Sequence, residues 1–237
     1  MAKKRISDVL IEVLANAGIE RIYGITGDSL NSVNDSLRRN GKIAFEHVRH
    51  EETAAFAAGA EASLTGKLTV CAGSSGPGNL HLINGLFDCH RNRVPVLAIA
   101  SHIPQSEVGL NYFQETHPEN LFKECSCFCE LVSNPKQMPE ILFRAMNAAV
   151  GNQDVAVIVL PGDVAVMEID ELPVWHHPRL PHIVPQRDDI EEMAAHLETG
   201  KRITLFCGAG CEGAHDEVVE LAKRLQAPVV HAFRGKQ

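Results

Sequence analysis

Short apolar runs alternate with longer amphipathic segments over residues 1–160, and this alternation limits the fold more than any other feature of the chain. Residues 94–100 (VPVLAIA) are almost purely apolar, which is typical of a strand buried on both faces of a parallel sheet. The expected strands are residues 21–25, 43–48, 68–72, 94–100, 125–132 and 155–160, and the expected helices are residues 7–17, 30–39, 51–63, 78–89 and 138–150. This order predicts an α/β fold built on a doubly wound, mostly parallel sheet.

The pattern changes after residue 161. Residues 171–186 are rich in proline and histidine and show no periodicity, so we place a linker at 176–187. Two helices and two strands are expected beyond it, at residues 188–197, 203–207, 213–225 and 228–232. Two strands form a sheet too small to bury both of its faces. We therefore predict a first domain at residues 1–175 and the truncated start of a second α/β domain at 188–237.

Charge and composition exclude several classes of function. The net charge of −8 argues against non-specific binding to nucleic acid. No apolar run reaches the ~18–20 residues that span a bilayer, and no signal-peptide core is present, so a cytoplasmic protein is expected. Cys125, Cys127 and Cys129 alternate at strand spacing, which predicts one buried row of thiols. Metal sites usually show C-x₂-C pairs or matched histidines, so no metal ligand is predicted.

Two glycine-rich turns join an expected strand to an expected helix. Residues 70–79 (VCAGSSGPGN) would bring backbone N–H groups to the positive end of a helix, although a tight turn alone would use similar residues. Residues 23–29 (YGITGDS) form the second turn, in which Asp28 or Ser29 could simply cap the helix. In a parallel sheet both turns and Glu51 fall at the carboxyl ends of strands, where ligands of open α/β sheets bind.

Other motifs carry weaker information. Residues 208–213 (GAGCEG) match G-x-G-x-x-G, but residues 231–235 (HAFRG) lack the acid that a dinucleotide fingerprint requires, which disfavours an NAD site. Hydrolase chemistry is not supported, because no G-x-S-x-G elbow occurs. Four scattered histidines are expected to be surface or supporting groups, not catalytic bases: His81, His90, His102 and His117.

Taken together, four segments resemble the thiamine-diphosphate-dependent 2-keto-acid enzymes, which include acetolactate synthase and pyruvate oxidase. The segments are YGITGDS at 23–29, RHEE at 49–52, GSSGPGN at 73–79 and NGLFDCHRNRVPVL at 84–97. YFQE at 112–115 and LPGDV at 160–164 are most similar to the bacterial pyruvate oxidases, especially the quinone-dependent pyruvate dehydrogenase. The resemblance covers the whole chain.

The resemblance implies three domains: a pyrimidine-binding domain, a central domain that carries FAD in the oxidases, and a diphosphate-binding domain. Residues 1–175 match the first domain and residues 188–237 the start of the second. The third domain's magnesium signature, Gly-Asp-Gly followed by Asn-Asn, does not occur in the chain. We therefore expect thiamine diphosphate, FAD and Mg²⁺ in the full-length enzyme, and we expect the chain by itself to be inactive and to hold none of them tightly.

The resemblance also assigns roles to residues. Glu51 would be the catalytic carboxylate beside the pyrimidine ring nitrogen, where it favours the imino tautomer of the aminopyrimidine. Its neighbour Glu52 would be a charge in the first turn of the helix. Phe113 and Gln114 would approach the substrate. The remaining cofactor contacts implied are Gly27, Gly76, Pro77 and Asn84 around the pyrimidine, and Gly208 and Gly210 at FAD.

The implied activity is oxidative decarboxylation of pyruvate to acetate, with electrons passed through FAD to a quinone. A homo-oligomer is expected, with no nucleic-acid partner, and any contact with the inner face of the plasma membrane would come from the missing C-terminal part. Two alternatives stay open. One is a carboligase fragment similar to acetolactate synthase, and the other is a non-catalytic α/β module that pairs with a full-length partner.

Overall fold

The computed structural model describes residues 3–170, 178 and 183–236. The chain divides into two compact units, Met1–Leu180 and Pro181–Gln237, and each is described here by itself. The linker predicted at 176–187 lies partly outside the described residues. None of the described helices is long and apolar enough to cross a membrane.

The first unit is built on a six-stranded sheet in which every neighbouring pair is parallel. In spatial order its strands are β3 (Ala44–His47), β2 (Arg21–Gly24), β4 (Thr69–Gly73), β5 (Val96–His102), β7 (Val155–Pro161) and β6 (Phe128–Leu131). The predicted α/β class and parallel sheet are confirmed. From β2 the chain first adds β3 on one side and then β4 on the other, so the strand order reverses between β2 and β4, and ligands of such sheets bind at this switch point.

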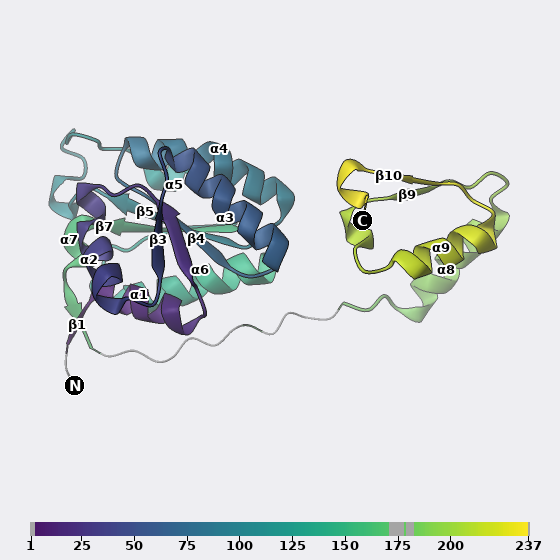
Figure 1. The fold of residues 1–237 in the computed structure, drawn as a ribbon, viewed down its shortest axis with the longest axis horizontal. Helices are drawn as coiled ribbons and strands as arrows, with labels where there is room; N and C mark the ends of the chain where they lie inside the picture. Colours follow the sequence, from purple (N-terminus) through teal and green to yellow (C-terminus); the bar gives the residue numbers. More distant parts are fainter. Residues whose placement is uncertain (1–2, 171–177, 179–182, 237) are drawn as a thin grey trace. The chain divides into compact units, whose positions relative to one another are not determined.

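Helices cover both faces of this sheet (Figure 1). One face is packed by α1 (Ile6–Asn16), α2 (Asn31–Asn40) and α6 (Met138–Asn152), and the other by α3 (Glu51–Thr65) and α4 (Pro77–Asn92). The apolar residues of β5 alternate between the two cores, since Leu97 lies in the first and Ala98 in the second. This double burial explains why the strand is apolar throughout.

Two local features differ from the sequence-based expectation. The short strands β1 (Lys4–Arg5) and β8 (Glu168–Ile169) pair antiparallel, and two residues are too few to give an alternating pattern. The predicted row of buried thiols is wrong: Cys125 is buried, but Cys127 is exposed. Strand β6 begins only at Phe128, because the preceding residues turn back and Cys125 N–H bonds to the carbonyl of Phe122.

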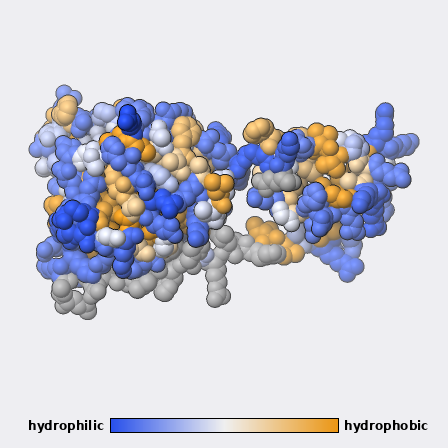
Figure 2. Space-filling model, viewed as in Figure 1, coloured by the Kyte–Doolittle hydropathy of each residue, from blue (hydrophilic) through white to orange (hydrophobic). Residues whose placement is uncertain are grey.

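The second unit contains α8 (Arg187–Thr199), β9 (Leu205–Cys207), α9 (His215–Leu225) and β10 (Val229–His231). Its two strands are parallel, with Phe206 opposite Val230. Both of these side chains are exposed, and apolar surface is visible on this unit in Figure 2. Of its described residues, only Cys207 and Ala227 are buried apolar positions. The two-stranded sheet therefore buries little surface within the unit, as the sequence predicts.

Candidate cofactor site

The two glycine turns of the first unit lie against each other at the switch point of the sheet. A methyl group added at Gly27, after β2, would lie 2.6 Å from the Cβ of Ser74, after β4. The N–H of Ser75 donates to the Oγ of Ser29 at 3.0 Å. The hydroxyl of Ser101, near the end of β5, donates to the carbonyl of Ser29 at 2.6 Å. Three strand ends are thus tied together at one edge, as the two turns predicted.

The turn after β4 has a backbone that requires glycine. Gly76 has φ +66° and ψ −112°, a combination that residues with a Cβ rarely adopt. Pro77 then begins α4 at a position where its missing N–H is not needed. Asn79, in the first turn of α4, is fully buried, and its Nδ2 donates to the carbonyl of Ser101 at 2.8 Å. These bonds fix the start of α4 relative to β5.

Glu51 is the first residue of α3, and only 6% of it is exposed. A methyl group added at Gly78, in the first turn of α4, would lie 3.2 Å from Oε1 of Glu51. The carboxyl group therefore lies at the N-terminal ends of two helices, where the positive ends of both helix dipoles favour a negative charge. The structure places this residue between a buried helix and the glycine turn, as the sequence predicts.

His81 is a member of this site that sequence reasoning did not assign. Its Nδ1 lies 3.0 Å from Oε2 of Glu51, and its ring stacks on that of His50 with centroids 4.2 Å apart and an angle of 25° between the planes. His81 follows Gly78 by three residues, so the two share one face of α4. The three-residue spacing between Gly78 and His81 could have indicated that His81 faces the site. The sequence did not show, however, that Glu51 packs against this face of α4.

Asn84 lies one turn further along α4 and bonds to a different carboxylate. Its Nδ2 donates to Oε1 of Glu52, not to Glu51, and its side chain is exposed. The main-chain N–H of Glu52 in turn donates to Nδ1 of His50, which caps α3. Glu52 therefore forms a bonded surface pair with Asn84, and among the described residues the hydrogen bond of Asn84 goes to Glu52 and not to the predicted pyrimidine-side carboxylate, Glu51.

The loop that carries Phe113 and Gln114 docks on the glycine turn. A methyl group added at Gly76 would lie 2.8 Å from the Cβ of Gln114, and the hydroxyl of Ser75 lies 3.3 Å from Oε1 of Gln114. Phe113 is 78% exposed. The structure thus brings both predicted substrate-side residues to the edge that holds Gly76, on a loop whose position the sequence pattern did not give.

A cavity of about 280 Å³ opens at this loop, and we call it the Phe113 cavity. Residues that line it include Asp28, Ser29, His102, Tyr112, Phe113 and Gln114. His102, at the end of β5, is 3% exposed, and its Nδ1 has no hydrogen-bond partner among the described residues. Burial lowers the pKa of His102, because charging the ring away from water is unfavourable. The imidazole at the cavity is therefore held in its neutral form.

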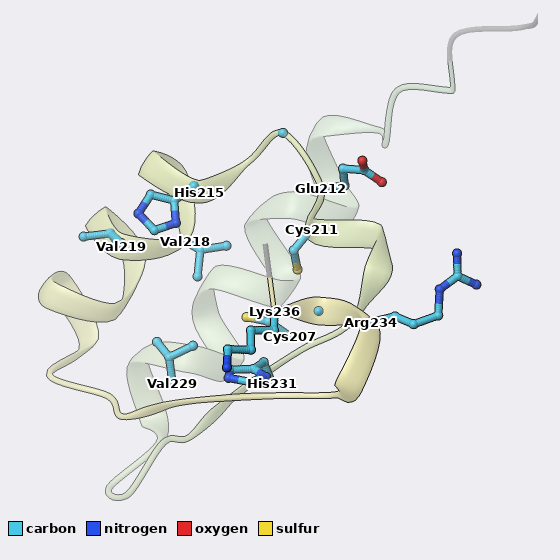
Figure 3. Close-up of a pocket in the computed structure, with 13 residues that line it drawn as sticks. Cys207, Cys211, Glu212, His215, Val218, Val219, Val229, His231, Arg234 and Lys236 are labelled. Atoms are coloured by element: carbon cyan, nitrogen blue, oxygen red, sulfur yellow. The ribbon is translucent and has the colours of Figure 1, made fainter. Parts of the chain in front are cut away.

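A second cavity, of about 390 Å³, lies in the second unit (Figure 3). It is lined by residues of the predicted G-x-G-x-x-G turn together with α9, β10 and the following turn, including Cys207, Gly208, Glu212, His215, His231 and Arg234. Gly208 is one of its lining residues, whereas Gly210 is not. Methyl groups added at Gly208 or Gly210 would meet nothing within 4 Å, so packing does not require glycine at either position.

No group of three or more His, Cys, Asp or Glu side chains is placed to hold a metal ion among residues 3–170, 178 and 183–236.

Comparison with known proteins identifies a domain of one enzyme family in each unit. Residues 4–121 match the N-terminal TPP-binding domain of thiamine pyrophosphate enzymes, and residues 190–237 match the central domain of the same enzymes. An uncharacterised 42.6 kDa protein of Pseudomonas amyloderamosa is 59% identical over 240 residues, which cover 100% of this chain and 61% of that protein.

Two relatives with named activities are more distant. Pyruvate oxidase of Lactiplantibacillus plantarum is 32% identical, over 96% of this chain and 38% of its own length. Acetolactate synthase of Arthrospira platensis is 33% identical, over 99% of this chain and 43% of its own length. The chain therefore spans well under two thirds of these relatives, and their identities do not separate the two activities. On the matches to both domains, the chain belongs to the thiamine-pyrophosphate-dependent enzymes.

Proposed function

We propose that the first unit forms the pyrimidine side of a thiamine diphosphate site, and that the whole protein decarboxylates pyruvate oxidatively to acetate. The observation that carries the proposal is the buried carboxyl group of Glu51 beside the two glycine turns. Bound thiamine diphosphate would supply a nucleophilic carbon for the keto group and an acceptor for the electron pair released on decarboxylation.

The residues present fit such a cofactor. Among the described residues the carboxyl group of Glu51 has one hydrogen-bonding contact, between its Oε2 and Nδ1 of His81, so the group has capacity for another partner. Its Oε1 lies against Gly78, where an added methyl group would be 3.2 Å from that oxygen and 2.8 Å from Oγ of Ser74, so glycine lets the carboxyl group approach the first turn of α4. A carboxyl group that is shielded from water can hold a proton for a ring nitrogen, or accept one from it, without competition from bulk solvent.

The Phe113 cavity supports a small keto acid as the substrate. Phe113 and Tyr112 offer apolar surface, while the side chain of Gln114 offers an amide that can bond to a carboxylate. The neutral imidazole of His102 adds a hydrogen-bonding group without a charge. A volume of about 280 Å³ is just below the ~300–1,000 Å³ of ordinary ligand pockets, which is ample room for pyruvate.

The remaining parts of the proposal concern the whole protein. FAD would bind to the complete central domain, with Gly208 among its contacts, and would pass electrons to a quinone. Gly210 does not line the cavity beside Gly208, so its predicted contact with FAD would have to be made in the complete domain. Mg²⁺ and the cofactor's diphosphate would be held by a domain beyond these residues, in a homo-oligomeric, cytoplasmic enzyme.

The closest competing proposal is a carboligase, since acetolactate synthase of Arthrospira platensis is as similar to this chain as pyruvate oxidase of Lactiplantibacillus plantarum is. The test mixes the chain with a separately expressed C-terminal portion of an enzyme of this family, which supplies the rest of the central domain and the diphosphate-binding domain, and adds thiamine diphosphate, Mg²⁺, FAD, pyruvate and a quinone. We expect acetate and reduced quinone in equal amounts. Acetolactate as the main product would support the carboligase, and a stable complex without turnover would support a non-catalytic module.

A further inference from the structure

We propose that His81 is a positioning residue for Glu51. In this role the Nδ1–H of His81 donates to Oε2 of Glu51, holds the carboxyl group in one orientation and leaves Oε1 as the oxygen available to a ligand. The inference rests on the proposed function, because it concerns the same carboxyl group, but its first test does not require turnover.

The need for a donor follows from burial. The side chain of Glu51 is 8% exposed, and an anion so poorly hydrated is costly unless hydrogen bonds compensate it. Hydrogen bonds to an ionised group are shorter and stronger than bonds between neutral groups. Within the part of the chain that the structure describes, Nδ1 of His81 at 3.0 Å supplies the only one that this carboxyl group receives.

The two ends of the carboxyl group are therefore different. Oε2 is occupied by His81, while Oε1 lies on the side of Gly78 at the start of α4. Because His81 fixes one oxygen, rotation about the last bond of the Glu51 side chain is restricted. A group held in this way presents one defined oxygen to a ring nitrogen, and such outer partners commonly set the orientation of a reacting side chain.

The same contacts fix where the hydrogen of each imidazole lies. A neutral imidazole has one N–H, and donation from Nδ1 to a carboxylate requires the hydrogen of His81 to be on Nδ1. The stacked ring of His50 is arranged in the opposite way. Its Nδ1 lies 3.3 Å from the main-chain N of Glu52 and 3.6 Å from Oε2 of Glu52, and the shorter contact, in which Nδ1 accepts the N–H, places the hydrogen of His50 on Nε2. Two stacked rings of opposite tautomer are therefore the signature of a hydrogen bond donated by His81 to Glu51.

The test is a long-range ¹H–¹⁵N correlation spectrum of the ¹⁵N-labelled chain at about pH 8.5, above the usual imidazole pKa of ~6.5. We expect the Nδ1–H form for His81 and the Nε2–H form for His50. The Glu51→Ala variant should move His81 toward the Nε2–H form. His90, whose Nδ1 lies 2.7 Å from Asp154, provides a matched control, because His90→Asn should leave the signals of both stacked rings unchanged.

A Nε2–H ring at His81 in the unaltered chain would overturn the proposal, because the bond would then run from a protonated Glu51. An unchanged His81 tautomer in Glu51→Ala would do the same. Neither outcome would refute the proposed function, because both concern only whether His81 donates a hydrogen bond to Glu51. Absence of turnover in the reconstituted enzyme, with both tautomers as expected, would instead refute the proposed function.

Kinetics of the reconstituted enzyme provide the second readout. His81→Ala should lower kcat about 10-fold, which corresponds to ~1.4 kcal/mol, with the KM for pyruvate changed less than ~3-fold. His81→Asn should recover most of this loss, because the amide of asparagine can donate from a similar place. Equal losses in His81→Ala and His81→Asn, or a loss of the same size in His90→Asn, would show that His81 only supports the fold.

Discussion

Replacement of Gly76 by alanine tests whether the loop that carries Gln114 is docked on the glycine turn. Gly76 has φ +66° and ψ −112°, a region in which a Cβ is strained whatever the surrounding space. The added methyl group would also lie 2.8 Å from the Cβ of Gln114 and 2.9 Å from its carbonyl oxygen. The carbonyl belongs to the backbone, so the contact can be relieved only if the loop moves away.

The magnitude follows from these two costs. Backbone strain of this kind costs ~1–3 kcal/mol, and overpacking of a close contact costs a further ~1–3 kcal/mol, so we expect a loss of about 4 kcal/mol in the free energy of unfolding. Gly66 is the matched control. It also has φ +66°, but its ψ is 9°, and a methyl group there would meet nothing within 4 Å. Gly66→Ala should therefore cost only ~1 kcal/mol.

The assay is urea unfolding of the first unit, monitored by far-ultraviolet circular dichroism. The dependence of the free energy of unfolding on urea concentration must be the same for all variants. Gln114→Gly should stabilise the Gly76→Ala variant more than it stabilises the unaltered protein, because it removes the contact with the Cβ of Gln114, whereas relief of the φ of +67° at Gln114 is the same in both backgrounds. If Gly76→Ala and Gly66→Ala differ by less than ~0.5 kcal/mol, or if Gln114→Gly has the same effect in both backgrounds, the docking of this loop is wrong.

Two further predictions concern packing and pH. A methyl group at Gly85 would lie 2.5 Å from the Cβ of Ala55 on the facing helix, so Gly85→Ala should destabilise the first unit by about 3 kcal/mol in the same assay. A methyl group at Gly151 on α6 would meet nothing within 4 Å, so Gly151→Ala should instead stabilise the first unit by ~0.5–1 kcal/mol. If Gly85→Ala and Gly151→Ala lowered the free energy of unfolding by the same amount, the close packing of α3 on α4 would be contradicted. Burial lowers the pKa of His102, so below pH ~6.5 this residue binds a proton in the unfolded chain but not in the folded chain. Proton binding then stabilises the unfolded state, and the free energy of unfolding falls as the pH is lowered below ~6.5. The free energy of unfolding should therefore decrease less between about pH 7 and pH 5 in His102→Asn than in the unaltered protein, and identical decreases would show that His102 is not the group responsible.

The sheet and its helices could be predicted because their signals are local. The apolar strands at β5 and β7 and the helix that begins at Glu51 are visible in the order of residues alone. The meeting of the two glycine turns was also predictable, since the carboxyl ends of parallel strands share one edge of a sheet. Glu51 could be placed there for the same reason.

The contacts between distant segments could not be predicted in this way. Thirty residues separate Glu51 from His81, and no periodicity relates α3 to the first turns of α4. Gln114 contacts Gly76 from an irregular loop, and the sequence of such a loop has no periodicity from which its position could be predicted. The exposure of Cys127 was missed because the apparent alternation of thiols begins before the strand does.

The most direct test of the central claim compares Glu51→Gln with Glu52→Gln in the reconstituted enzyme, by the rate of pyruvate-dependent quinone reduction. The two glutamates are adjacent, but Glu51 is buried at the glycine turns while Glu52 bonds to Asn84 at the surface. A proton-transferring group contributes ~10²–10⁴-fold to the rate, so Glu51→Gln should lower kcat by at least ~100-fold, while Glu52→Gln should stay within ~3-fold of the unaltered enzyme. Full activity in Glu51→Gln, or a larger loss in Glu52→Gln, would contradict the assignment of Glu51 to the cofactor.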